Sequence, residues 1–174
     1  MSSQFIEFAE YKHLECPQSW VNALLNQYSI FFWNLVATQV VVSKESHLER
    51  GGMFDTDTIY SVTTTERFAT IDLKRRRDIP YLDYIKQYEQ RYMQICGNLI
   101  DLGCTPLDNY TSPPPVKGIG CLGALWSMSL AGRGYSKKIK ATNEQKALQY
   151  QQLKTELDNL LISYRQFLTA YGFG

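Results

Sequence analysis

The sequence predicts an α+β protein: an antiparallel β-hairpin or small sheet packed with helices, followed by a long C-terminal helix. Two segments, 31–43 and 58–74, are rich in the β-branched and aromatic residues that favour strands. Apolar residues recur at helical spacing in 80–102 and again in 142–171. With 174 residues, of which 44% are apolar and 20% charged, the chain is long enough to bury a core.

The N-terminal segment predicts two helices. Phe5 to Leu14 is expected to form a short helix that Ser2 or Ser3 opens. A second helix is expected to begin at Pro17, because proline suits the first helical position, and to end near Tyr28. Its apolar face would carry Trp20, Val21, Leu24 and Leu25.

Two strands are expected next, joined by a polar loop over 46–57. Val40–Val42 places apolar side chains on both faces of the first strand, which indicates a central position in the sheet. In the second strand Ala69, Ile71 and Leu73 alternate with polar residues and therefore share one face. The two strands together predict an antiparallel hairpin.

A helix is expected from Pro80 to Leu102, with Gly103 as its stop signal. The proline-rich segment that follows predicts an extended, semi-rigid spacer. The expected organisation is an α+β domain over 1–104, a linker over 105–117, an apolar segment with a basic cluster over 118–140, and an amphipathic helix over 141–174.

The C-terminal helix is expected to begin at Thr142-Asn143-Glu144-Gln145, which has the form of a capping box, and to end at Gly172. Its apolar and aromatic residues recur at intervals of three and four. Two interpretations stay open, because such a face either packs on its own domain or binds a protein partner or a second copy of the chain. The partner-binding anchors would be Leu157, Leu160, Tyr164 and Phe167.

An uncharged, glycine-rich run from Gly118 to Gly132 directly precedes a basic cluster. It suits a short or re-entrant membrane segment, a peripheral attachment to anionic lipid, or a buried segment of a soluble protein. The residues expected to contact a membrane surface or an anion are Arg133, Lys137, Lys138 and Lys140. The first residues contain no export signal, and the cysteines show no paired spacing. We therefore expect reduced thiols and a cytoplasmic protein, with attachment to a membrane as the alternative.

The net charge of +1 argues against a wholly basic nucleic-acid-binding protein. Residues 1–110 hold 10 Lys and Arg against 14 Asp and Glu, whereas residues 111–174 hold 8 against 3. A second cationic run lies at the end of the second strand. It predicts a solvated strand end, and the alternative interpretation is contact with phosphate or nucleic acid. Its residues are Lys74, Arg75, Arg76 and Arg77.

The sequence carries no recognised catalytic signature, so no catalytic residue, metal ligand or cofactor is assigned. Gly118–Gly123 matches a dinucleotide-binding pattern, but it follows three prolines and not a strand. The acidic residues around His47 and the His13–Cys16 pair are minor metal or thiol candidates. We expect a protein that is not an enzyme, with an unrecognised enzyme as an alternative.

The threonine run and alternating strand of Thr63–Arg75, followed by Asp78-Ile79-Pro80-Tyr81-Leu82, resemble a pattern in uncharacterised small bacterial proteins. The resemblance covers residues 17–96 and implies a hairpin–helix architecture, often followed by a membrane segment. This chain lacks the paired N-terminal cysteines of that group, and the group supplies no activity. The sequence therefore predicts a non-catalytic protein-interaction module that contacts partners or itself through the C-terminal helix, with membrane association as an option.

Overall fold

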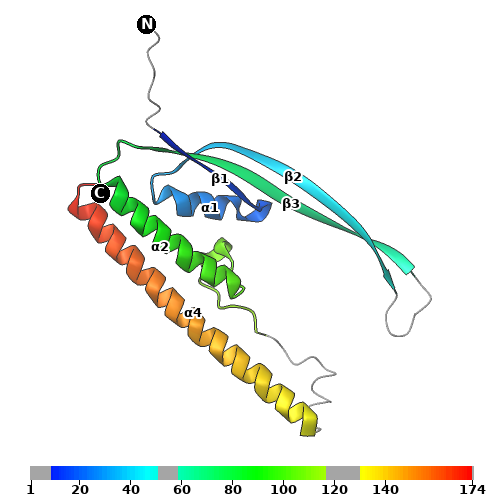
Figure 1. Cartoon of the computed structure of the whole chain (residues 1–174). Helices are drawn as coiled ribbons and strands as arrows, with labels where there is room; N and C mark the ends of the chain where they lie inside the picture. Colours follow the sequence, from blue (N-terminus) through cyan, green and yellow to red (C-terminus); the bar gives the residue numbers. More distant parts are fainter. Residues whose placement is uncertain (1–8, 51–58, 117–129, 174) are drawn as a thin grey trace. The chain divides into compact units, whose positions relative to one another are not determined.

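A computed structural model describes residues 9–50, 59–116 and 130–173, with side chains placed for 9–43, 65–116 and 138–173. The chain forms two compact units, Met1–Leu82 and Asp83–Gly174. The first holds an antiparallel sheet and the second holds the long helices, so the predicted α+β class is confirmed (Figure 1). The boundary between the units falls within the predicted α+β domain over 1–104.

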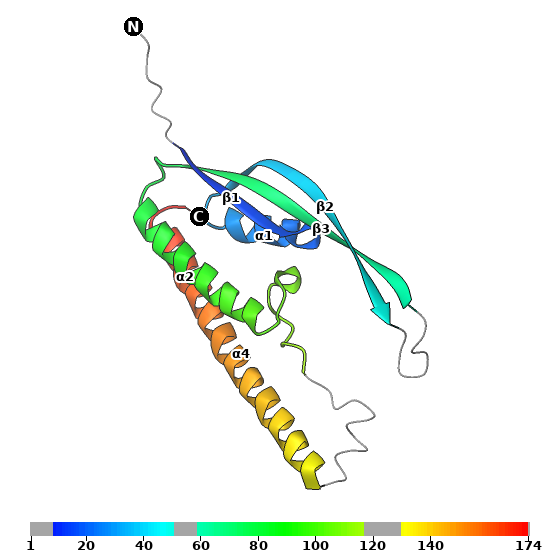
Figure 2. The ribbon, with the colours of Figure 1, turned by 45° about the vertical axis from the view of Figure 1, so that its right-hand side comes forward.

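The sheet of the first unit contains β1 (Ala9–Pro17), β2 (Asn34–Arg50) and β3 (Ile59–Arg76) in the order β1-β3-β2. Strand β1 pairs with β3 only as far as Pro17, which lies opposite Phe68. The β2–β3 pairing continues to Arg50 opposite Ile59. Beyond Phe68 the hairpin therefore projects as a two-stranded arm (Figure 2).

Two predictions about the strands are wrong. The expected helix over Phe5–Leu14 is instead strand β1 from Ala9 onward. Strand β2, which carries Val40–Val42, lies at the edge of the sheet, because β1 takes the far side of β3 and makes β3 the central strand. The hairpin itself is confirmed: β2 continues into the expected loop as far as Arg50, and β3 begins at Ile59, one residue after the predicted start of the second strand.

Helix α1 (Val21–Ser29) follows a short 3₁₀ turn, η1 (Gln18–Trp20), close to the prediction, and covers one face of the sheet (Figure 1). The face of β3 that was predicted to be apolar is buried: Ala69, Ile71 and Leu73 are at most 1% exposed. Phe31 and Trp33, from the turn that returns the chain to β2, are also buried. These side chains form the core of the first unit.

The second unit is built on two antiparallel helices, α2 (Leu82–Asp101) and α4 (Leu130–Ala170). Helix α2 ends as predicted, because Gly103 takes a φ of +98° and donates its N–H to the carbonyl oxygen of Ile100 at 2.8 Å. The ring of Tyr88 lies 5.0 Å from that of Tyr164, measured between centroids, so aromatic packing joins the helices.

The predicted start of the C-terminal helix is wrong. Thr142 lies inside α4, where its hydroxyl donates to the carbonyl oxygen of Lys138 at 2.9 Å and does not cap a helix. The predicted end is confirmed, since Gly172 takes a φ of +77° directly after the last turn.

The proline-rich segment after α2 packs within the second unit. It contains the 3₁₀ turn η2 (Pro106–Asp108), and its buried residues include Cys104, Tyr110 and Pro114. The hydroxyl of Tyr150 on α4 donates a shared hydrogen bond to the carbonyl oxygens of Tyr110 and Thr111, at 3.0 and 2.8 Å. This part of the chain is thus held against α4.

We expect Leu157→Ala to destabilise the second unit by about 2 to 5 kcal/mol, because it empties a site in which the side chain is 2% exposed. Chemical denaturation followed by helical circular dichroism measures the change. Ile162→Ala on the same helix is the control, since Ile162 is 52% exposed. Equal stabilities of the two variants would contradict the packing of α4 described above.

Candidate functional site

Arg75 is a buried cation that contacts three parts of the first unit. Its side chain is 3% exposed, and its Nη2 donates to Glu10 Oε2 on β1 at 2.9 Å. Its Nη1 donates to the backbone carbonyl oxygen of Phe31 at 3.3 Å, and its guanidinium carbon lies 4.3 Å from the centroid of the Trp33 ring. Arg75 therefore connects β3, β1 and the turn before β2, which is a structural role.

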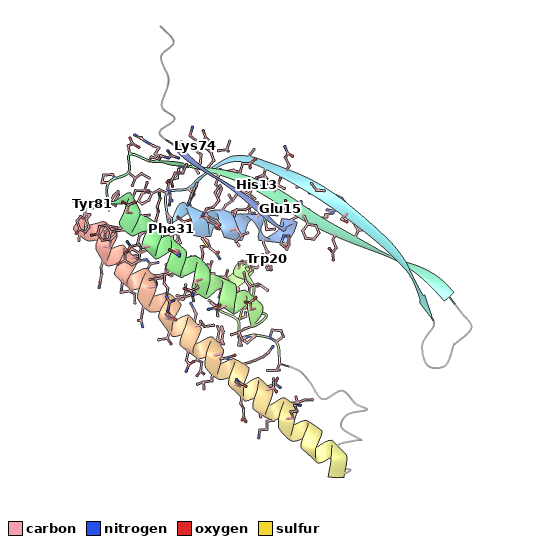
Figure 3. The ribbon with its side chains drawn as sticks, viewed as in Figure 1. His13, Glu15, Trp20, Phe31, Lys74 and Tyr81 are labelled. Atoms are coloured by element: carbon pink, nitrogen blue, oxygen red, sulfur yellow. The ribbon has the colours of Figure 1, made fainter. Side chains whose placement is uncertain are left out.

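The rest of the predicted phosphate-contact run is dispersed. The ammonium of Lys74 lies 5.4 Å from the centroid of the Tyr11 ring (Figure 3). Arg76 pairs with Asp78, and this hydrogen bond lowers the pKa of the Asp78 carboxyl. Arg77 is exposed. Because successive strand residues point to opposite faces, Arg75 points away from the face that carries Lys74 and Arg76. Phosphate or nucleic-acid contact stays a prediction.

The exposed face of the sheet carries a histidine–carboxylate pair. His13 Nδ1 lies 2.7 Å from Asp72 Oδ1, and His13 Nε2 lies 4.0 Å from Glu15 Oε1 (Figure 3). The hydrogen bond to Asp72 is the main cause of the raised pKa of His13. Cys16 alternates to the opposite face, where burial raises the pKa of its thiol. The fold does not bring the predicted His13–Cys16 pair together.

Strand β2 presents a row of apolar side chains at the sheet edge. Val40, Val41 and Val42 are 48%, 54% and 50% exposed. Leu35 and Val36 on the same strand are 50% and 56% exposed. In the part of the chain that the structure describes, β2 has a neighbouring strand on one side only. An exposed apolar edge strand is a template for pairing with a further strand, which folded monomers usually block.

The predicted anchors on α4 face their own unit to different extents. Leu157 and Tyr164 are 2% and 1% exposed, and Leu160 and Phe167 are partly exposed. The Phe167 ring lies 5.6 Å from that of Tyr88 on α2, measured between centroids. Packing within the second unit thus uses much of this face, and its use by a partner stays a prediction.

The predicted basic cluster lies at the start of α4. Lys138 and Lys140 are exposed. Arg133 and Lys137 are within the helix, but their side chains, like most of Gly118–Gly132, lie outside the described residues. The membrane or anion contact of this cluster therefore stays a prediction. In the described part of the chain, every helix is too short or too polar to span a bilayer.

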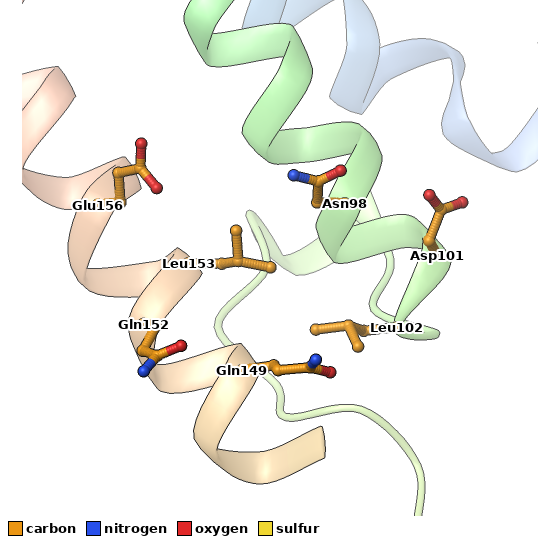
Figure 4. A pocket seen from close by; sticks show the side chains of 7 residues that line it. All are labelled: Asn98, Asp101, Leu102, Gln149, Gln152, Leu153 and Glu156. Carbon is orange, nitrogen blue, oxygen red and sulfur yellow. The ribbon is translucent and has the colours of Figure 1, made fainter. Parts of the chain in front are cut away.

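An open pocket of about 370 Å³ lies between α2 and α4 (Figure 4). Two leucines line it together with amides and carboxylates; the residues are Asn98, Asp101, Leu102, Gln149, Gln152, Leu153 and Glu156. Glu156 already pairs with Arg91. The pocket offers hydrogen-bonding groups, but no nucleophile next to a base.

The remaining candidates for chemistry are metal-ligating side chains and thiols. Among the described residues, no three His, Cys, Asp or Glu side chains gather closely enough to hold a metal ion. The loop candidates around His47 lie where side chains are not described. Burial raises the pKa of Cys96 to about 11 and also raises that of Cys104, so both thiols stay protonated at neutral pH.

Comparison of the chain with protein-family models, curated proteins and solved structures finds no match. The resemblance of residues 17–96 to small bacterial proteins therefore stays a prediction. The sequence predicts a central strand for the valines of β2, and this position is wrong. An apolar run indicates burial, but it does not indicate which strands lie beside it.

We expect Arg75→Ala to destabilise the first unit by about 3 to 5 kcal/mol, because it leaves the Glu10 carboxylate partly buried without its cation. Denaturant unfolding followed by tryptophan fluorescence, to which Trp33 contributes, measures the change. Arg77→Ala is the control, since its exposed side chain should change stability by about 0.5 kcal/mol or less. An Arg75→Ala variant as stable as this control would contradict the bridging role of Arg75.

We expect His13 to titrate above its ordinary value of 6.5, because the Asp72 carboxylate favours the imidazolium. A raised pKa in the folded state means that this pair stabilises the fold fully below pH 6.5 and that its contribution is lost as the pH rises through the raised value. NMR titration of the imidazole measures the pKa. Asp72→Asn should return it toward 6.5; an identical titration curve in that variant would exclude Asp72 as the cause.

Proposed function

We propose that this protein is a non-catalytic protein-interaction module whose contact surface is the free edge of strand β2. The observation that carries the proposal is the exposure of Val40, Val41 and Val42, each about half exposed on a strand with one neighbour among the described residues. Apolar side chains on an unpaired edge favour association with an extended polypeptide, since main-chain hydrogen bonds supply affinity and side-chain packing supplies specificity.

The charge pattern of the strand supports this use. From Leu35 to Ser43, β2 contains no charged residue. The other edge strand, β1, carries Glu10, Lys12 and Glu15, which are residues of the type that blocks edge pairing. The two edges of the sheet therefore differ, and β2 is the one open to a further strand.

The length of the hairpin also supports the proposal. Beyond the Phe68–Pro17 pair the arm has two strands, and an isolated two-stranded ribbon is marginally stable in water. A strand added along β2 would extend the sheet next to this arm. Compared with this edge, the C-terminal helix offers less: its exposed apolar residues, such as Leu148 and Ile162, are separated by polar ones.

A photo-crosslinking amino acid in place of Val41, in the full-length chain in cells, tests the proposal. We expect ultraviolet-dependent adducts whose attachment site on the partner is an extended segment. The same amino acid in place of Leu107 is the control, because Leu107 is equally exposed, at 56%, but lies in the second unit. The proposal fails if a folded Val41-substituted chain gives no more adduct than the control.

A further inference from the structure

We infer that the polypeptide that pairs with β2 is the β2 strand of a second copy of this chain, antiparallel and centred on Val41. This inference rests on the proposed function and adds the identity of the partner. A two-fold axis perpendicular to the sheet would bring the two strands together, so that each copy uses the same surface. The result is one continuous sheet with the order β1-β3-β2-β2-β3-β1.

The register follows from the side-chain alternation of β2. In an antiparallel pair related by this axis, opposite residues must lie on the same face, so the axis passes through a residue position and not between two. Centring on Val41 places Val41 opposite Val41 of the second copy and Val40 opposite Val42. Centring on Val40 would set Val42 opposite Thr38, and centring on Val42 would set Val40 opposite Lys44. Only the Val41 register pairs each valine with a valine.

The flanking positions are compatible with this register. Moving outward from Val41, Gln39 falls opposite Ser43, Thr38 opposite Lys44, and Ala37 opposite Glu45. No like charges meet, and such meetings are what destabilise cross-strand pairs. The β-bulge between Leu35 and Ala37 limits the ladder at one end. A ladder from Ala37 to Glu45 is then roughly 30 Å long at the usual rise of a strand.

Phe68 is a second reason to place the two-fold axis at Val41. It lies opposite Val41 in the β2–β3 pairing and therefore shares its face, where it is 41% exposed. Across the two-fold axis the order of side chains becomes Phe68, Val41, Val41 of the second copy and Phe68 of the second copy. Four half-exposed apolar side chains thus form one cluster, and their burial is the driving force for association.

Charge-swapped variants of the full-length chain test the pairing. In sedimentation velocity at about 100 µM the parent chain should be a dimer, and Val41→Lys and Val41→Glu should each raise the dissociation constant about tenfold or more, because like charges meet on the axis. A mixture of the two variants should recover a heterodimer. This recovery separates loss of the interface from loss of the fold.

Disulfide trapping tests the register. In a Cys121→Ser background, Val41→Cys should oxidise to a covalent dimer, since directly opposite Cβ atoms lie within about 4.5 to 5.5 Å. Ser43→Cys is the matched control on the same strand, because its symmetry mate would lie about 13 Å further along the ladder.

Three outcomes overturn the inference: a monomeric parent, a dimer that neither charge variant weakens, or equal trapping at positions 41 and 43. None of these outcomes decides the proposed function, which the crosslinking experiment tests separately. An adduct with a different polypeptide there would keep β2 as a binding edge while excluding a second copy as its occupant. Failure of both experiments would exclude the edge itself.

Discussion

The pairing of Arg75 with Glu10 is the interaction on which the first unit depends. The two residues are direct register partners of β3 and β1, and the guanidinium also binds the carbonyl oxygen of Phe31 and stacks on Trp33. A one-residue shift of β1 would move Glu10 to the other face and leave a buried cation without its counter-charge. The ion pair thus specifies one register for β1 and one path for the turn that leads into β2.

This register determines which surfaces remain free. Strand β1 has 9 residues and β3 has 18, so β1 covers only part of the central strand. The remaining length belongs to the β2–β3 arm, and among the described residues the outer side of β2 is a sheet edge. The half-exposed valines at that edge are the observation on which the proposed association rests. In the second unit, the rings of Tyr88 and Tyr164 pack against each other.

Local pattern was sufficient where one face of an element is apolar and the other polar. The alternation of Ala69, Ile71 and Leu73 and the stop signals at Gly103 and Gly172 were read correctly for this reason. Strand β1 was missed because its inward positions include Glu10 and Lys12, whose charged ends are satisfied by Arg75 and by the rings of Tyr28 and Trp33. The motif at Thr142 was misread because the helix begins twelve residues earlier, at Leu130.

The sequence by itself determined the α+β class, the hairpin, the helix ended by Gly103 and the C-terminal end of the last helix, because each of these follows from neighbouring residues. The tertiary structure alone decided that β3 is central, that Arg75 is buried and that Val40–Val42 lie at an edge. These features depend on contacts between residues such as Glu10 and Arg75, which are 65 positions apart. Periodicity indicates which side chains are apolar, but it does not indicate which strand will cover them.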